Sequence, residues 1–276
     1  MMLLLGAVYG DIIGSYYEAR CTKNYGFEFN RDSKFTDDSV LIAAVCQAVT
    51  IDPSEISVMK LRRRAKEYGA QYRRYYSLFP NAGFGNMFKA WASDPGAKNC
   101  RSFGNGGAMR AIPIGYAYES MKQTMLQAKA SCLSTHNSRE AIKAARAVAA
   151  AVFLARQNES KENIRLFLEK SFGYDLSVPI ESIRSSHVFD SRSSYSVPPA
   201  IICFLQSKDY ESAVRNAVSL GGDADTEGCI AGGIAEAYYK HIPDHIRCFC
   251  DPKIDISIKN AVRAFEKKFC KNSEGL

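Results

Sequence analysis

The chain has 276 residues, 46% of them hydrophobic and 24% charged, a composition typical of a globular protein with a sizeable core. No run approaches the roughly 20 apolar residues of a membrane span, so we expect no membrane association, and the apolar start carries no basic residue, so we expect no signal peptide. Nine scattered cysteines without a CxxC pair indicate reduced thiols and a cytoplasmic protein, or a nuclear one if the source is eukaryotic. The net charge of +7 suits an anionic partner without identifying one.

Helical periodicity runs through most of the chain. An apolar run at 40–49 follows the segment FTDDSV, and the glycine- and proline-rich stretch 80–107 is predicted to be a long functional loop. Helices are predicted over 138–157, 211–220, 226–241 and 256–270, and the second of them ends at a glycine pair. No segment shows the alternation of apolar and polar residues that is typical of a β-strand, and no domain boundary stands out. The sequence therefore predicts a single all-α domain over residues 1–276.

Two segments place a threonine and two aspartates at a predicted helix start. The first holds Thr36, Asp37 and Asp38, and the second holds Asp223, Asp225 and Thr226. Four clustered carboxylates repel one another strongly, and two divalent cations would balance their charge. Oxygen ligands favour Mg²⁺, Mn²⁺ or Ca²⁺ over zinc. The alternative is that both segments only cap helices, because Asp and Thr are good N-cap residues.

Other site classes fit these patterns less well. An EF-hand loop that began at Asp223 would need glutamate where Ile234 stands. A phosphatase with an aspartyl nucleophile would carry its acidic pair after an apolar strand, whereas here an amphipathic helix and two glycines come first. The histidines and cysteines at 241–250 match no standard zinc spacing. The basic and aromatic segment 61–76 is better explained as a solvated helix face than as a nucleic-acid surface.

Two glycine-containing loops predict close backbone approach to an anion. RSFGNGGAMRAIP, at 101–113, has three glycines within four positions but matches neither common nucleotide loop. Gly83 and Gly85 in NAGFG form a second such loop. Asp11 and Glu18 in GDIIGSYYEA are seven positions apart, so a helix would put them on nearly one face. His187, in a serine-rich stretch, is given no role.

Seven motifs occur in the order seen in the ADP-ribosylglycohydrolase family, the dinuclear-magnesium ADP-ribosyl-acceptor hydrolases. They are GAVYGDIIGSYYEA, FTDDSV, NAGFG, FGNGGAMR, STH, SVPPAIICFL and SLGGDADT, and they cover roughly residues 3–240. The chain most resembles the branch that releases ADP-ribose from serine. The resemblance implies an orthogonal all-α bundle with two Mg²⁺ ions, replaceable by Mn²⁺, at the base of a cleft. It also implies a monomer that acts on an ADP-ribosylated protein or an ADP-ribose derivative.

The resemblance assigns roles to individual residues. The metals would be held by Thr36, Asp37, Asp38, Asp223, Asp225 and Thr226, with Glu18 and Asp38 as the catalytic residues. The substrate would be bound by Gly83, Gly85, Ser102, Phe103, Gly104, Asn105 and His136. Phe103 stands where that branch often has tyrosine. Glu227 replaces an apolar or small residue, which adds a carboxylate near the expected metals.

The activity expected from this set is Mg-dependent hydrolysis of the ribosyl C1″ bond of ADP-ribose on a protein. Serine is the favoured acceptor and arginine the alternative. Cleavage of this bond develops oxocarbenium character, as in glycoside hydrolysis, and metals that bind the ribose hydroxyls would hold the sugar in place. Two other functions stay open: hydrolysis of free derivatives such as O-acetyl-ADP-ribose or poly(ADP-ribose), and silent ADP-ribose binding. The intact acidic set argues against a silent module.

Overall fold

The computed structural model describes residues 4–270, and these form helices with no β-strand among them. In chain order the helices are α1 Gly6–Ser15, α2 Asp37–Ile51, η1 Val58–Lys60, α3 Leu61–Leu78, α4 Asn86–Ser93, α5 Gly106–Met109, α6 Ile112–Ala117, α7 Met121–Cys132, α8 Arg139–Arg156, α9 Lys161–Phe172, α10 Ile180–Ser186, α11 Ser193–Leu205, α12 Tyr210–Val218, α13 Ala224–Tyr239, α14 Asp244–Cys250, η2 Asp251–Lys253 and α15 Ile256–Phe269. The predicted all-α fold is confirmed. The predicted domain limits, 1 and 276, lie outside the described residues.

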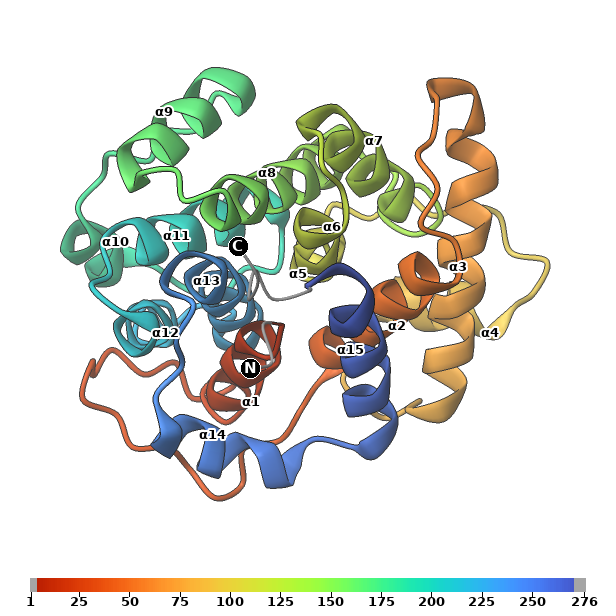
Figure 1. Cartoon of the computed structure of the whole chain (residues 1–276). Helices are drawn as coiled ribbons and strands as arrows, with labels where there is room; N and C mark the ends of the chain where they lie inside the picture. The colour runs from red at the N-terminus through yellow and green to blue at the C-terminus, as the bar shows by residue number, and fades with distance from the viewer. Residues whose placement is uncertain (1–3, 271–276) are drawn as a thin grey trace.

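Helices α1 and α13 lie against each other near the centre of the molecule, although they come from opposite ends of the chain (Figure 1). A Cβ atom on Gly10 would lie 2.0 Å from the carbonyl oxygen of Gly228, and one on Gly14 would lie 2.1 Å from that of Ala224. Only glycine permits this backbone contact, since any larger residue would force the helices apart. The small residues of α13 therefore allow the close approach that the sequence predicts, and the segment after α1 lies beside the start of α13.

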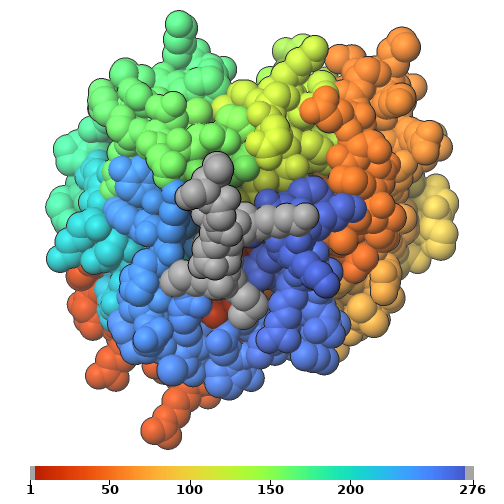
Figure 2. Space-filling model, in the orientation of Figure 1, coloured from red at the N-terminus to blue at the C-terminus, as the bar shows by residue number. Residues whose placement is uncertain are grey.

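The remaining helices enclose this pair in a continuous apolar core. Helices α8, α11 and α12 pack against α13, while α2 packs between α3 and α15. Figure 1 shows α8 running across the view, whereas α13 and α12 are seen nearly end-on, so the helices cross at steep angles. Figure 2 shows the C-terminal segments, in blue, between the green middle of the chain and its orange N-terminal part. The alanines that predicted α8 are buried, which lets neighbouring helices approach it closely.

Two predictions about local structure are wrong. The predicted loop 80–107 contains a helix, α4, because Phe88 and Trp91 lie on one helical face and are buried in the core. Glu18 does not share a helix face with Asp11, because α1 ends at Ser15 and the chain continues as a series of turns. Glu18 therefore reaches its position through a turn.

The other sequence segments have structural roles. In α3 the side chains of Tyr68, Tyr72 and Tyr75 are buried, so the aromatic residues face the core and most of the basic residues face solvent.

The nine cysteines all lie in the described part of the chain and are free thiols. His245 is exposed and lies 3.1 Å from a carboxylate oxygen of Glu211. Between residues 4 and 270, no helix combines the length and the apolarity that a bilayer crossing requires.

Candidate active site and metal centre

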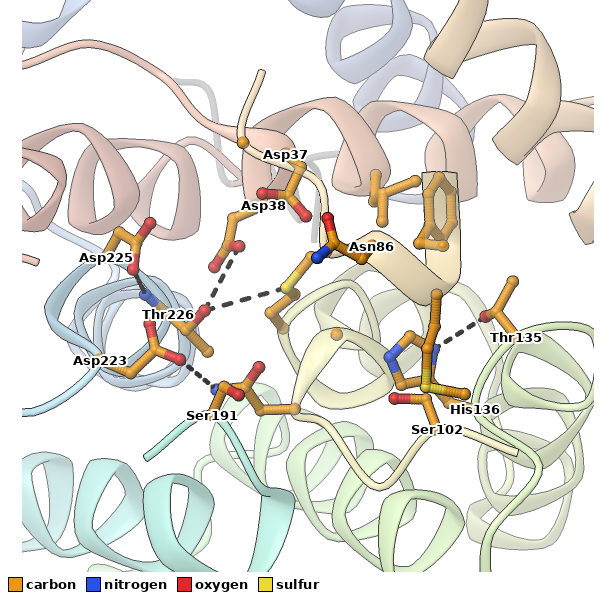
Figure 3. A pocket seen from close by; sticks show the side chains of 18 of the residues that line it. Asp37, Asp38, Asn86, Ser102, Thr135, His136, Ser191, Asp223, Asp225 and Thr226 are labelled. Carbon is orange, nitrogen blue, oxygen red and sulfur yellow. Dashed lines mark hydrogen bonds between the residues drawn. The ribbon is translucent and has the colours of Figure 1, made fainter. Parts of the chain in front are cut away.

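A pocket of about 370 Å³ opens between the start of α2, the start of α13 and three loops. Eleven of the predicted site residues line it: Glu18, Asp37, Asp38, Gly83, Gly85, Ser102, Asn105, His136, Asp223, Asp225 and Thr226. Thr36, Phe103 and Gly104 do not, and the Phe103 side chain is exposed. Gly106, one of the glycines predicted to approach an anion, also lines it, as do Leu41, Asn86, Met87, Phe88, Met109, Thr135, Phe189 and Ser191, which the sequence did not indicate. Figure 3 shows the acidic residues on one side of the pocket and His136 on the other.

The acidic side brings together carboxylates from three segments. Oxygen atoms of Glu18, Asp223 and Asp225 all lie within 4.8 Å of one another. The Thr226 hydroxyl donates to Asp38 Oδ1 over 3.4 Å, whereas Asp38 Oδ2 is buried and has no hydrogen-bond partner among the described residues. A buried carboxylate oxygen without a donor is costly, and a divalent cation is the partner that suits it. The donor set present, oxygen atoms alone, fits a hard cation such as Mg²⁺.

Burial and mutual repulsion disfavour ionisation of these carboxyl groups. Burial, followed by the charge of Asp225, raises the pKa of Asp37 and Asp38 well above the ordinary value. Burial and the charge of Asp223 do the same for the pKa of Asp225. Burial, with Asp225 second, raises the pKa of Glu18 to about 7. Positive charge placed among these groups would reverse the effect, so the cluster is built to receive cations.

Asp11 fixes the start of α2, and this role was not evident from the sequence. Its fully buried carboxylate accepts hydrogen bonds from the Thr36 amide at 3.0 Å, the Thr36 hydroxyl at 2.7 Å and the Ser39 amide at 3.1 Å. It also accepts from the Ser39 hydroxyl. Burial raises the pKa of Asp11 to about 6, while these donors oppose the shift. The one signal in the sequence was an aspartate inside an apolar, glycine-containing helix.

Capping accounts for Thr36 in the first motif but not for Asp223 in the second. Thr36 caps α2, because its hydroxyl oxygen accepts from the Asp38 amide. Asp223 stands at the N-cap of α13 but makes no capping hydrogen bond with its side chain. Asp223 Oδ2 instead accepts from Asn105 Nδ2 over 2.8 Å. This contact ties the predicted glycine-rich loop to the acidic side of the pocket.

His136, on the opposite side, is held in one protonation state. Arg110 Nη2 donates to Thr135 Oγ1 over 2.7 Å, and Thr135 Oγ1 lies 2.8 Å from His136 Nδ1. With Arg110 donating to its oxygen, the Thr135 hydroxyl can donate its own hydrogen to Nδ1 or accept from Nδ1–H through its second lone pair. Burial, reinforced by Arg110, lowers the pKa of His136 well below its ordinary value. The imidazole is therefore neutral, and the tautomer in which Thr135 donates to Nδ1 carries the hydrogen on Nε2 and points it toward Gly106.

The glycines predicted to allow close approach do so at specific atoms. Gly83 has φ of +109°, a conformation that favours glycine, and a Cβ there would lie 3.2 Å from Asp37 Oδ1. A Cβ on Gly106 would lie 2.9 Å from His136 Nε2. Gly85 has no neighbour within 4 Å of a built Cβ, so it borders open space. These loops bring backbone to both sides of the pocket without filling it.

The residues 187–193, which we call the strap, form another wall of the pocket. The strap follows α10 and runs along the predicted glycine-rich loop. The amide of Asn105 donates to the Ser191 carbonyl over 2.8 Å, and the amide of Ser193 donates to the Phe103 carbonyl over 2.9 Å. Phe189 and Ser191 line the pocket. The serine-rich stretch thus contributes directly to the site.

Glu227 does not add its carboxylate to the acidic cluster. It is fully buried, but it does not line the pocket, and its Oε1 lies 2.6 Å from His187 Nε2. Burial raises the pKa of Glu227 to about 7, and the contact with His187 opposes the shift. The Glu227 charge nevertheless contributes to the raised pKa of Asp223, so the expected added carboxylate acts on the cluster from outside the pocket. His187, which had no predicted role, is the partner of Glu227.

Comparisons with known proteins agree with this geometry. The family model described as ADP-ribosylglycohydrolase matches residues 1–271. The chain is 28% identical to ADP-ribosylhydrolase ARH3 of Homo sapiens, over 96% of this chain and 93% of that protein. It is 26% identical to ADP-ribosylhydrolase ARH3 of Mus musculus, over 96% and 91% of the two chains.

A solved structure supports the fold. A chain of an ADP-ribosylglycohydrolase-related protein complex superposes with a TM-score of 0.71, at 21% identity, over 97% of this chain and 96% of that one. At this identity the likeness concerns the arrangement of helices. The chain belongs to the ADP-ribosylglycohydrolase family and is an enzyme that hydrolyses an ADP-ribosyl glycosidic bond.

Proposed function

We propose that this enzyme uses two divalent cations, Mg²⁺ or Mn²⁺, to release ADP-ribose from a modified protein, with serine as the favoured acceptor. The observation that carries the proposal is the convergence of Glu18, Asp223 and Asp225 at the end of a pocket that also holds a neutral histidine. The proposed ligands are Thr36, Asp37, Asp38, Asp223, Asp225 and Thr226. When bound, the cations supply compensating charge and polarise oxygen atoms of the ribose.

The two sides of the pocket suit the two halves of ADP-ribose. Ser102 and the Nε2–H of His136 provide neutral hydrogen-bond donors that a diphosphate accepts. The loop around Gly83 and Gly85 leaves room for a bulky anion. With the diphosphate on this side, the scissile ribose reaches the acidic side. We therefore assign Gly83, Gly85, Ser102, Asn105 and His136 to substrate binding, and place Phe103 and Gly104 at the rim.

Glu18 is the proposed acid–base residue. Burial and the nearby charge of Asp225 raise its pKa to about 7 in the metal-free protein, and cations bound in the cluster would lower it, which would leave the carboxylate ionised and able to act as a base. From the turn after α1 it faces the carboxylates of α13. In this role Glu18 orients the attacking water and takes its proton. Asp38, the other proposed catalytic residue, is held in position by the hydrogen bond from the Thr226 hydroxyl. Negative charge around the ribose also stabilises the oxocarbenium character of the C1″ carbon.

The test is a panel of ADP-ribosylated substrates with the purified protein. Serine-linked and arginine-linked ADP-ribosyl peptides and O-acetyl-ADP-ribose are incubated with Mg²⁺, and release of ADP-ribose is followed by chromatography. We expect release from the serine-linked peptide, and loss of that release with EDTA. Equal activity in EDTA would refute the cation requirement. Release from O-acetyl-ADP-ribose alone would refute the protein acceptor.

A further inference from the structure

The hydrogen bond between His187 and Glu227 lies where three segments of the pocket meet. His187 begins the strap, and Glu227 lies in the first turn of α13, directly after Thr226. The ammonium of Lys23, from the segment after α1, donates to the carbonyl oxygens of His187 and Leu220. The strap, the start of α13 and the segment that carries Glu18 are therefore joined at one point.

The imidazole of His187 fills the space beside the glycine pair before α13. A Cβ on Gly222 would lie 2.4 Å from His187 Nε2 and 2.9 Å from Glu227 Oε1, so only glycine admits the ring at this place. Gly222 directly precedes Asp223, one of the clustered carboxylates. The position of the strap and the position of this acidic segment are thus set by the same contact.

The strap has two attachments and an exposed stretch between them. At one end the Ser191 carbonyl accepts from the Asn105 amide, and the Ser193 amide donates to the Phe103 carbonyl. At the other end the His187 side chain contacts Glu227, and the Lys23 ammonium donates to the His187 carbonyl. Between them Val188 is 70% exposed and Phe189 is 48% exposed, so little packing holds this stretch in place. Because Phe189 also lines the pocket, its position depends on both attachments.

We propose that the His187–Glu227 hydrogen bond is a latch that holds the strap as a wall of the active-site pocket. Both residues are positioning residues, since neither lines the pocket that would hold the ribose. The buried carboxylate makes the latch specific: Glu227 Oε2 has no hydrogen-bond partner among the described residues, so Oε1 depends on His187. The effect on catalysis rests on the proposed function, whereas the order of the strap does not.

The experiment compares variants by hydrogen exchange and by binding. His187→Ala opens the latch, Glu227→Gln keeps a group that still bonds to His187, and the double variant His187→Ala/Glu227→Met removes the buried carboxylate as well. The matched control is His245→Asn, which breaks a histidine–glutamate contact of 3.1 Å on the surface. Amide exchange is measured by mass spectrometry over 188–193, and ADP-ribose binding by calorimetry in Mg²⁺ buffer.

We expect faster exchange over 188–193 in His187→Ala and in the double variant, with wild-type exchange in Glu227→Gln and His245→Asn. We also expect the two open variants to bind ADP-ribose about tenfold more weakly, and to raise KM by about as much with kcat within about twofold of wild type. The double variant keeps the test valid if His187→Ala unfolds, since removing both partners leaves no unpaired carboxylate.

Unchanged exchange over 188–193 in the double variant would overturn the latch. Faster exchange throughout the protein, with no excess in the strap, would overturn it too, because it would show a general loss of stability. If wild-type protein fails to bind ADP-ribose, the proposed function fails, yet the exchange comparison still decides whether the latch exists.

Discussion

The hydroxyl of Thr226 donates a hydrogen bond of 3.4 Å to the Oδ1 atom of Asp38, 188 positions away along the chain. This contact joins the two motifs that each combine a threonine with two aspartates. It also leaves Asp38 Oδ2 free of hydrogen-bond partners in the described part of the chain. The two helix starts therefore face each other across a common space, and each carboxylate affects the ionisation of the others.

Glu18→Gln should separate binding from turnover. The amide keeps the size of the side chain but neither takes nor gives a proton, so we expect turnover of a serine-linked substrate to fall by about 10²–10⁴-fold. ADP-ribose binding in Mg²⁺, measured by calorimetry, should stay close to wild type. Glu28→Gln is the control, since that exposed glutamate lies in the nearby loop but outside the pocket. Near-normal turnover in Glu18→Gln would contradict the acid–base role.

Asp225→Ala should lose activity without losing the fold. Its carboxylate is buried among like charges, so its removal relieves repulsion in the metal-free protein. We expect the metal-free Tm to equal or exceed that of wild type, and the rise in Tm on adding Mg²⁺ to disappear. The exposed Asp32→Ala is the control and should keep that rise. A full Mg²⁺-dependent rise in Asp225→Ala would exclude this residue as a ligand.

The stability of the metal-free protein should fall as pH rises. Folded Asp11 and Asp223 have pKa values raised to about 6 and Glu18 to about 7, all above the ordinary values of 3.8 and 4.5. A raised pKa means that the folded state binds more protons, so this contribution is fully present below about pH 4 and is lost as pH climbs through 6 and 7. Calorimetric scans should show Tm decreasing over this window in EDTA.

Mg²⁺ should reverse that trend, because bound cations favour the ionised carboxylates. Saturating Mg²⁺ is therefore expected to raise Tm more at pH 7.5 than at pH 5, because more of the carboxylates that bind the ion are ionised at the higher pH. The same scans on Asp225→Asn serve as the comparison. In EDTA we expect its Tm to depend less steeply on pH than that of wild type. Identical slopes with and without Mg²⁺ would show that the acidic cluster does not bind the ion.

Thr135→Val should weaken substrate binding by freeing His136. Valine keeps the shape of the side chain but removes the hydroxyl between Arg110 and Nδ1, so the Nε2–H form is no longer favoured. We expect ADP-ribose affinity to fall by about tenfold, as for one lost hydrogen bond to a charged ligand. Thr135→Ser should restore it. Nitrogen NMR of labelled histidine reports the tautomer directly, and an unchanged His136 signal in Thr135→Val would refute the relay.

Gly10→Ala should destabilise the fold, because a Cβ there would lie 2.0 Å from the backbone oxygen of Gly228. Overpacking between rigid helices costs about 1–3 kcal/mol, or more where backbone must move. Gly85→Ala is the matched control, since a built Cβ at Gly85 meets nothing within 4 Å. Urea unfolding followed by circular dichroism measures both. Equal midpoints for the two variants would contradict the close contact of α1 and α13.

The sequence predicted features that are encoded locally. Thr36 and Asp38 predicted a helix start, and the glycines at 83 and 106 predicted close approach, because each depends on near neighbours. The end of α1 was missed, since apolar periodicity alone does not show that the helix stops before Glu18. The hydrogen bond of His187 to Glu227 joins residues 40 positions apart, and only the folded chain brings them together.

The contact of α1 with α13 has a consequence for how the enzyme is made. The Gly6 amide donates to Glu236 over 2.7 Å, across 230 positions of chain. During synthesis α1 therefore leaves the ribosome long before α13, and it cannot make this contact until α13 has been translated. Such distant pairing slows folding, and a nascent chain that stops before α13 holds only half of the acidic cluster. The acidic cluster is thus completed only after α13 has been translated and packs against α1.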